Sequence, residues 1–421
     1  MDYIKKDLSS YNLHMIKTNK FKSINIEVIF SGPIKKEYIT LNNFLSTMLT
    51  YSTKKYNTKI AFSKKAEDLY ATSVFANGYR LGKKYNIDFN MRVLNDKYTE
   101  NGLLEKAIDF LYEIIFNPNI KNNEFDLTSF SIVKNNEKSQ IERFKEDQRS
   151  YSTLKLLEYY DKDAPFSYNL KGYLDDLEKI TPKTLFEYYK YFIKNNSIDI
   201  FIIGDIDFDY VEKIISKKLV FNNKKDLIND LVVDYKPHRK KIQKIVESDN
   251  TNQAKLSIAC SLENLTKYEK NYVLNIYNII LGGSADSKFF KNIREKFSLC
   301  YYVVSSAYKL DNLIIISSGI NKENFNKMLI LIEKEMADMK NGNFNEEDID
   351  KAKKYYISAL DEIEDNPSQI IASYYAIDKL GIDTLEERKK KIEKVTKKDI
   401  MSLANKIFID TVYLLGGDKK W

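Results

Sequence analysis

The sequence has few of the residues that build disulfide-bonded or metal-bound folds. Its 421 residues include only two cysteines, Cys260 and Cys300, and two histidines, His14 and His238. Two cysteines exclude a disulfide framework and a cysteine-based zinc ribbon. Motifs such as H-x-x-E-H and H-E-x-x-H need two histidines on one helical turn, and these two lie far apart in the sequence. The chain therefore cannot build a zinc site of that kind.

Glycine and proline are also scarce, and long apolar runs are absent. With 13 glycines and 6 prolines, the composition excludes collagenous and low-complexity chains. No apolar stretch approaches the roughly 18 residues that a membrane-spanning helix needs. The N-terminus lacks the basic and then apolar layout of a signal peptide. We therefore expect a cytoplasmic protein with no membrane partner.

Charge of one sign is not concentrated in the chain. Sixty-seven Lys and Arg against 60 Asp and Glu give a net charge of +7, which is a small excess for this length, so we expect no nucleic-acid partner. One basic run, Lys236–Lys241 (KPHRKK), would suit either a nucleic-acid patch or a solvated linker. It contains no interleaved aromatic residue and lies in the polar segment 222–244. We interpret that segment as a linker.

The sequence repeats one order of elements in two halves. In the first half, Leu177–Thr181 (LEKIT) precedes an apparent helix and an apolar strand that ends at Gly204-Asp205. In the second half, Ile392–Thr396 (IEKVT) precedes the same pair, which ends at Gly417-Asp418. An ordered set of matches across a helix and a strand indicates duplication of one unit of about 200 residues.

The hydrophobic pattern predicts an α+β protein made of two homologous domains. Alternating stretches such as 23–31 and 87–93 predict strands, and longer polar stretches at 124–160 and 346–380 predict long helices. We expect domains at 1–221 and 245–421, joined by the linker 222–244. Each domain should have a mixed or antiparallel sheet with helices packed on one face.

Several stretches resemble the pitrilysin/insulinase family of zinc peptidases, the inverzincins with H-x-x-E-H. In the second half, Leu281–Phe290 (LGGSADSKFF) and Ile293–Tyr301 (IREKFSLCY) resemble the family's glycine-containing turn, its helix ending in R-E-K, and G-L-A-Y. Ser298 replaces the glycine of that last motif. In the first half, Asn43–Leu49 (NFLSTML) has the frame of H-F-L-E-H-M-L, and Ile114–Ile120 resembles I-x-x-N-P. The resemblance covers essentially the whole chain and implies two domains arranged as a clam shell.

The chain departs from the family at its zinc site. In the family, two histidines bind zinc and the intervening glutamate is the general base, at positions i, i+3 and i+4 of one helical face. Those positions are Asn43, Ser46 and Thr47 in this sequence. A neutral amide and two alcohols neither bind zinc well nor act as a base near neutral pH.

The family's third zinc ligand is a glutamate on a long helix. It corresponds most nearly to Gln140, although Glu137 or Glu142 would also suit the position because the interval from Thr47 is longer than in the family. A single carboxylate does not restore a zinc site. The resemblance therefore implies the fold without metal or other cofactor in this chain.

Two residues that matter in active members are retained. In the family, an Arg and a Tyr of the second domain hold the substrate backbone and stabilise the oxyanion; their counterparts are Arg294 and Tyr301. Taken alone, Arg294 is an ordinary basic residue of a last helical turn and Tyr301 is one core aromatic among 31 tyrosines. Within the motif we favour the functional interpretation of both. Gly282 and Gly283 belong either to a loop that contacts substrate or to a turn that ends a helix.

The resemblance implies a catalytically silent subunit of a bacterial heterodimeric zinc peptidase. A homologous partner with H-x-x-E-H would supply the zinc and the base, and this chain would contribute Arg294, Tyr301 and half of a chamber for an unfolded peptide. The alternative is a non-proteolytic scaffold of the same fold that binds a peptide or a protein. No set of residues supports an independent hydrolase. His14 is expected in a strand, and both cysteines as small buried residues.

Overall fold

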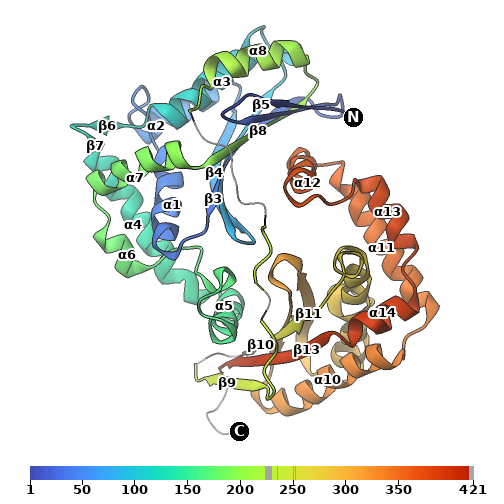
Figure 1. The fold of residues 1–421 in the computed structure, drawn as a ribbon. Coiled ribbons are helices and arrows are strands. Elements are labelled where there is room, and N and C mark those ends of the chain that lie inside the picture. The colour runs from blue at the N-terminus through green and yellow to red at the C-terminus, as the bar shows by residue number, and fades with distance from the viewer. Residues whose placement is uncertain (223–229, 235, 250, 252, 417–421) are drawn as a thin grey trace. The chain divides into compact units, whose positions relative to one another are not determined.

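The protein divides into two compact units. The computed structural model describes residues 1–222, 230–234, 236–249, 251 and 253–416. The first unit comprises Met1–Arg143, Asn169–Leu231 and Asp365–Ala372, and the second comprises Phe144–Tyr168, Val232–Glu364 and Ser373–Trp421. Figure 1 shows the course of the chain.

The first unit is built on a six-stranded mixed sheet in the order β1-β2-β8-β3-β5-β4. Only β2 and β8 pair in parallel; the other neighbours are antiparallel. The strands are β1 (Asp2–Asp7), β2 (Asn12–Lys17), β3 (Ser23–Pro33), β4 (Ser73–Leu81), β5 (Lys84–Leu94) and β8 (Ser197–Gly204), and a short pair is formed by β6 (Ile120–Lys121) and β7 (Glu124–Phe125).

Helices cover one face of this sheet. Alternate residues of β3, such as Ile26, Val28 and Phe30, join Phe44 and Leu111 in one apolar core, as the period of two in a strand requires. The other face carries polar residues such as Glu27 and Asn86 together with buried apolar residues such as Ile29 and Phe201. The helices are α1 (Lys36–Leu49), α2 (Lys59–Asp68), α3 (Leu103–Phe116), α4 (Leu127–Arg143), α6 (Leu174–Lys179), α7 (Pro182–Asn195) and α8 (Phe208–Lys218).

The second unit has a five-stranded sheet in the order β11-β12-β10-β13-β9, with only β9 and β13 parallel. Its strands are β9 (Gln243–Glu247), β10 (Ala254–Leu262), β11 (Cys300–Tyr308), β12 (Leu313–Ile320) and β13 (Ile407–Leu415). Its helices are α5 (Gln148–Tyr160), α9 (Leu274–Asn278), α10 (Phe325–Asn341), α11 (Glu346–Ile363), α13 (Leu385–Glu393) and α14 (Lys397–Ala404), with π-helical turns η4 (Glu269–Val273), η5 (Ile279–Gly283) and η6 (Phe289–Glu295); α12 (Pro367–Leu380) begins within Asp365–Ala372.

The strand orders support the duplication. Read from β4, the first sheet runs β4-β5-β3-β8-β2, and the second runs β11-β12-β10-β13-β9 with its parallel pair at the same place. The repeated threonines have equal roles, because Thr181 and Thr396 each cap the following helix with a capping box. The predicted fold class is confirmed within each unit. Gly417-Asp418 of the second repeat lies outside the described residues.

The compact units differ from the predicted continuous halves in one exchange of segments. Residues 144–168 come from the first half but belong to the second unit, where α5 lies against β10 and β13 (Figure 1). Leu156 is buried there, and the Ser152 hydroxyl lies 2.9 Å from that of Ser257. Asp365–Ala372 makes the opposite transfer to the first unit.

The two long helices that the pattern predicts are wrong, because each is broken into two helices where the chain passes from one unit to the other. The helix expected at 124–160 breaks between α4 and α5, where the Asp147 carboxylate accepts from the Ser150 N–H at 3.2 Å and starts a new helix. The helix expected at 346–380 breaks before Pro367, where the Asn366 side chain accepts from the Ser368 N–H at 2.9 Å. A new N-cap redirects the chain at each break.

The predicted linker is partly ordered. Residues 223–229 and 235 of the segment 222–244 lie outside the described part of the chain. Within the rest, Val233 is buried in the second unit and β9 begins at Gln243. Arg239 of the basic run forms an ion pair with the buried Asp410 and donates to the carbonyl of Tyr160 at 2.9 Å. This arginine therefore holds the end of α5.

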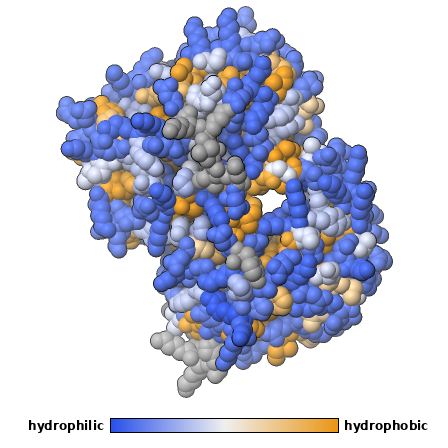
Figure 2. Space-filling model, in the orientation of Figure 1, coloured by the Kyte–Doolittle hydropathy of each residue, from blue (hydrophilic) through white to orange (hydrophobic). Residues whose placement is uncertain are grey.

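The surface visible in Figure 2 is mostly hydrophilic, with apolar residues in separated groups. Among the described residues, no helix combines the length and the apolar character needed to cross a bilayer.

Candidate functional site

The positions that correspond to the zinc motif lie on α1 of the first unit. Asn43 and Thr47 are one helical turn apart and half-buried, and Ser46 is buried. The Ser46 hydroxyl donates to the Asn43 carbonyl at 2.8 Å, so it is engaged with the backbone of its own helix. The spacing of i and i+4 places Asn43 and Thr47 on the same face of α1.

A glutamate of α4 completes this group. The Asn43 amide donates to one Glu137 carboxylate oxygen at 2.7 Å, and the Thr47 hydroxyl donates to the other at 2.7 Å. Glu137 is 2% exposed, whereas Gln140 is exposed to solvent. The third position is therefore occupied by Glu137 and not by Gln140, which sequence numbering had favoured. Asn43, Thr47 and Glu137 form what we call the Glu137 cluster.

Glu137 is a buried acid, and each of its carboxylate oxygens accepts a hydrogen bond within the cluster. Burial raises the pKa of Glu137 above its ordinary value, and the Thr47 hydroxyl, the positive charge of Lys171 and the Asn43 amide oppose that rise. Zinc needs ligands that offer lone pairs. Here an amide N–H and a hydroxyl O–H point at the carboxylate and occupy its oxygens. The residues present do not fit a zinc ion.

The retained arginine lies at the end of η6 in the second unit. Arg294 is exposed, and its guanidinium lies 4.7 Å from the centre of the Phe290 ring. After η6 the chain turns at Ser298, whose φ of +52° is the left-handed conformation that favours glycine. This left-handed backbone conformation explains why the family's G-L-A-Y motif has glycine where this chain has Ser298.

The retained tyrosine is presented by a β-bulge. Cys300 pairs with Ile320 and Tyr302 pairs with Gly319, so Tyr301 has no partner of its own across β12. A bulge re-aims a side chain, and Tyr301 is 76% exposed. For an aromatic residue on a strand this is high exposure. A ring that packed in the core would be covered, so the interpretation of Tyr301 as a core aromatic is wrong.

The two glycines end the helical segment η5. A Cβ on Gly282 would meet the Phe289 ring at 2.5 Å and the Ser305 backbone nitrogen at 3.0 Å. A Cβ on Gly283 would meet the Asn278 carbonyl oxygen at 2.9 Å. Close packing therefore accounts for both glycines, and their predicted contact with substrate stays a prediction.

The structure thus forms two separate groups from the predicted residues. The Glu137 cluster lies in the first unit, and Arg294, Tyr301 and the two glycines lie in the second. Two predicted residues stay out of these groups: Gln140 is exposed to solvent, and the Ser46 hydroxyl bonds to the backbone of α1.

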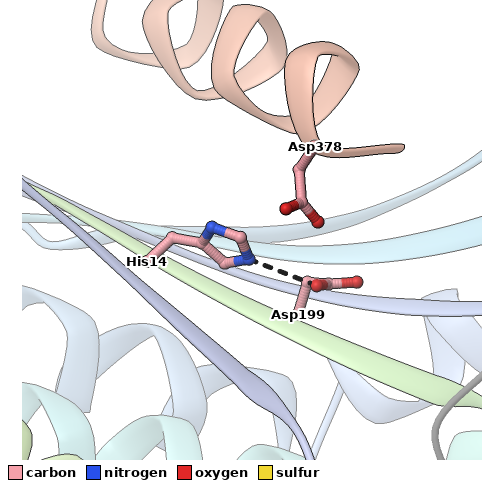
Figure 3. A group of neighbouring side chains, drawn as sticks. All are labelled: His14, Asp199 and Asp378. Carbon is pink, nitrogen blue, oxygen red and sulfur yellow. Dashed lines mark hydrogen bonds and ion pairs between the residues drawn. The ribbon is translucent and has the colours of Figure 1, made fainter. Parts of the chain in front are cut away.

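A buried pair made of one histidine and one aspartate on the first sheet was not predicted as a site. Figure 3 shows His14 of β2 and Asp199 of β8, whose Nε2 and Oδ1 atoms lie 3.2 Å apart. The Tyr3 hydroxyl lies 2.8 Å from His14 Nδ1, and Phe201 stacks on the ring at 4.0 Å. Asp378, also drawn, belongs to the other unit. The strand position of His14 is confirmed, but pairing across 185 residues leaves no local sequence signal.

The same polar face of the first sheet holds a second buried acid. Glu27 of β3 lies opposite Asn90 of β5 and is 6% exposed. Burial, reinforced by the negative charge of Asp88, raises the pKa of Glu27 to about 8, and a hydrogen bond with Ser368 opposes the rise. This carboxyl group is therefore largely protonated at neutral pH.

Comparisons with known proteins show similarity to one family. Residues 179–356 match the family model of the Peptidase M16 inactive domain. The whole chain is similar to the probable inactive metalloprotease YmfF of Bacillus subtilis, with 29% identity over 408 residues that cover 96% of this chain and 95% of that protein. The chain is similar to M16-family proteins of the inactive type. The predicted resemblance is confirmed.

Solved structures agree with this family. A conserved protein from Enterococcus faecalis V583 is similar over 100% of both chains, with a TM-score of 0.92 and 27% identity. The M16 inactive domain from Pseudomonas fluorescens matches with a TM-score of 0.80 at 15% identity, over 100% of this chain and 99% of that one. At that identity the second match shows the fold alone. The Glu137 cluster gives a physical reason for the similarity of this chain to M16 proteins of the inactive type.

Proposed function

We propose that this chain is the non-catalytic subunit of a heterodimeric zinc peptidase of the cytoplasm. A homologous subunit with H-x-x-E-H would bind the zinc and provide the base. This chain would contribute Arg294 and Tyr301 to that subunit's site, together with part of the surface that holds an unfolded peptide.

The exposure of Tyr301 at its bulge is the observation that carries the proposal. A phenol on a strand that is mostly uncovered in its own unit can donate to a group outside it. The Phe290 ring limits the freedom of the neighbouring arginine side chain. A guanidinium and a phenol are suitable donors for a substrate carbonyl and for the oxyanion formed when water attacks it.

The Glu137 cluster supports assignment of the catalytic role to a partner. Its amide and hydroxyl leave no ligand set for zinc and no base at the Ser46 position. The chain on its own should therefore hold no zinc and cleave no peptide.

The test begins with the tagged chain purified from its native host. Mass spectrometry should identify a one-to-one partner that contains H-x-x-E-H, and the complex should contain zinc and cleave unfolded peptides. In that complex, R294A and Y301F should each lower kcat by about 10²-fold or more, because each removes a donor to the oxyanion. Size-exclusion chromatography should show that both variants still assemble.

Matched controls lie on the same elements. K296A changes a basic residue in the turn after η6, and Y308F removes an exposed hydroxyl from β11. Both controls should leave kcat unchanged. Stoichiometric zinc and peptidase activity in the isolated chain would contradict the proposal.

The alternative is a scaffold that binds a peptide or protein without proteolysis. The hydrogen bonds that Glu137 accepts from Asn43 and Thr47 favour this scaffold in one respect. They stabilise the buried carboxylate at the position of the family's zinc site without a metal or a partner. Under this alternative, the co-purifying protein lacks H-x-x-E-H, and R294A and Y301F alter no catalytic rate.

A further inference from the structure

A pocket of about 650 Å³ lies on the first sheet at the end where β4 is the last strand. Two neighbouring rows of the sheet line it. Arg92 of β5 pairs with Ser73 of β4 and with Asn25 of β3, and Asn90 of β5 pairs with Phe75 of β4. Its lining also includes Lys20–Ser23 and Asp365–Ser368, and all of these residues belong to the first unit. We call it the Arg92 pocket.

Arg92 carries a charge that no acidic residue neutralises. Its side chain is exposed, and its Nε donates to the Ser23 hydroxyl at 3.2 Å. It forms no ion pair with any residue that the structure describes. The bond at Nε holds the guanidinium at the start of β3 and leaves the two terminal nitrogens for a ligand. Paired N–H groups of a guanidinium match the two oxygens of a carboxylate.

The Arg92 pocket as a whole has an excess of positive charge. Lys20, Lys22 and Arg92 line it, whereas Asp365 is the one acidic residue among its lining residues. The Asp365 carboxylate pairs with Lys20 at 3.1 Å. The Lys22 ammonium lies 5.9 Å from the centre of the Tyr98 ring and, within the described chain, is paired with no carboxylate. Two cations therefore remain for an anion to neutralise.

Asn90 provides a hydrogen-bond acceptor in the same pocket. This residue is 8% exposed, and its amide nitrogen donates to the Asp88 carboxylate at 2.7 Å. Its side-chain oxygen accepts from none of the described residues. Buried polar atoms are normally hydrogen-bonded, so an N–H of a ligand would complete this one. Glu27, which pairs with Asn90 across β3 and β5, is largely protonated at neutral pH and adds little repulsion toward an anion.

We propose that the Arg92 pocket binds a peptide through one of the peptide's carboxylate groups. Arg92 and Lys22 hold the carboxylate, and the Asn90 oxygen accepts from a backbone N–H of the peptide. The Phe75 ring, which is 46% exposed, packs against an apolar side chain of the peptide. A peptide carries all three kinds of group on one chain, and the volume is within the usual range for ligand pockets.

The choice of a peptide rests on the proposed function and on its scaffold alternative, because both assign peptide binding to this chain. The Arg92 pocket adds a class of peptide, namely one with an available carboxylate. It includes none of Arg294, Tyr301 or the Glu137 cluster, so its test needs neither a partner nor catalysis. A failure to bind acidic peptides therefore leaves the zinc and partner experiments unaffected, and the reverse also holds.

The carboxylate can come from an acidic side chain or from the C-terminus of the peptide, and titration distinguishes the two. The full chain is titrated calorimetrically with short unfolded peptides of one apolar sequence. The first contains glutamate and has an amidated C-terminus. The second contains glutamine and has a free C-terminus. The third contains glutamine, has an amidated C-terminus and thus carries no carboxylate.

We expect saturable one-to-one binding of the first or the second peptide, at least about tenfold tighter than binding of the third. Tighter binding of the first assigns the Arg92 pocket to an acidic side chain, and tighter binding of the second assigns it to a peptide C-terminus. Equal affinity for all the peptides, or no binding at millimolar concentration, overturns the proposal.

Variants locate the binding. R92M should weaken binding of the acidic peptide by about tenfold, because it removes a charge-assisted contact. R143M changes an exposed arginine at the end of α4, outside the Arg92 pocket, and is the matched control. It should bind as the original protein does. Equal affinity of R92M and R143M overturns the assignment to this pocket.

A charge reversal gives a readout that a purely structural role of Arg92 would not produce. R92E should lose the preference for the acidic peptide and bind more tightly the amidated peptide in which lysine replaces glutamate. Circular dichroism establishes that the variant is folded. A folded R92E that keeps the preference of the original protein overturns the proposal.

Discussion

At the residue scale, the side chains around Glu137 are hydrogen-bond donors, whereas the ligands of a metal site offer lone pairs. Where zinc ligands would direct lone pairs at a cation, Asn43 and Thr47 direct hydrogens at an anion, at 2.7 Å each. The acidic partner and the helical frame are still in place. Only the two side chains on α1 separate this arrangement from a set of three ligands.

A double substitution should therefore create a zinc site. The variant N43H/T47H places two imidazoles at i and i+4, facing the Glu137 carboxylate. We expect one zinc ion per chain by elemental analysis after dialysis, and a tetrahedral spectrum with cobalt. The matched control is the same variant with E137Q, which should bind zinc at least about tenfold more weakly. Equal zinc content in both proteins would contradict the geometry described for Glu137.

The buried Glu27 predicts a specific dependence of stability on pH. Its pKa is about 8 in the folded chain and close to 4.5 in the unfolded chain. Between these values the unfolded state releases a proton that the folded state keeps, so the stability from this group is present below pH 4.5 and is lost as the pH rises to 8. The loss should be on the order of a few kcal/mol.

Urea unfolding from pH 5 to 8.5 measures this effect. E27Q cannot ionise, so its free energy of unfolding should fall less over this range than that of the original protein. E333Q, at an exposed position on α10, is the control and should follow the original protein. Parallel curves for E27Q and the original protein would show that Glu27 titrates normally.

At the element scale, α5 is the helix whose place in the molecule is least evident from its sequence. It follows α4 with only a short 3-10 turn between them, yet it packs on the sheet of the other unit. Leu156 and Tyr160 supply its buried side, and the Tyr160 hydroxyl lies 3.0 Å from the Ser261 hydroxyl. Arg239 fixes its last carbonyls. The second face of this sheet is therefore covered by a segment from the other half of the chain.

A fragment experiment tests this dependence. Residues 245–421 alone should bind the dye ANS strongly, because Leu313, Ile315 and Tyr413 would lose the helix that buries them. Adding a peptide of residues 144–168 should reduce the dye signal. The control peptide carries L156D, which places a charge in the apolar contact and should have no effect. Low dye binding by the fragment alone would mean that α5 is dispensable.

Local signals in the sequence predicted most elements but not the contacts between distant ones. The alternation of 23–31 predicts β3, and the apparent helix after Leu177–Thr181 is α7. The break at Asp147 was missed because an N-cap aspartate inside a polar stretch looks like any other surface residue. Glu137 could not be distinguished from Gln140, since a ligand position depends on the helical phase of α4 against α1. The bulge at Tyr301 depends on pairing with β12, which no local pattern encodes.

At the scale of the whole molecule, two copies of one sheet share a strand order and a capping threonine, and they exchange segments. Duplication explains the first two features. The exchange means that each unit is assembled from non-contiguous parts of the chain, so cutting at the middle of the sequence separates α5 from the sheet it covers. The two copies are thus alike in construction but are not independent in folding.

The placement of α5 also sets an order of events during synthesis. The apolar side of α5 leaves the ribosome about a hundred residues before β10, the first strand of its contact surface. Strand β13, which completes that surface, is made later still. At translation rates of roughly 5–20 residues per second, the helix waits at least several seconds for its contact surface. During that interval α5 is the segment of the nascent chain that most needs protection, and a chaperone that binds short apolar helices would find it at every round of translation.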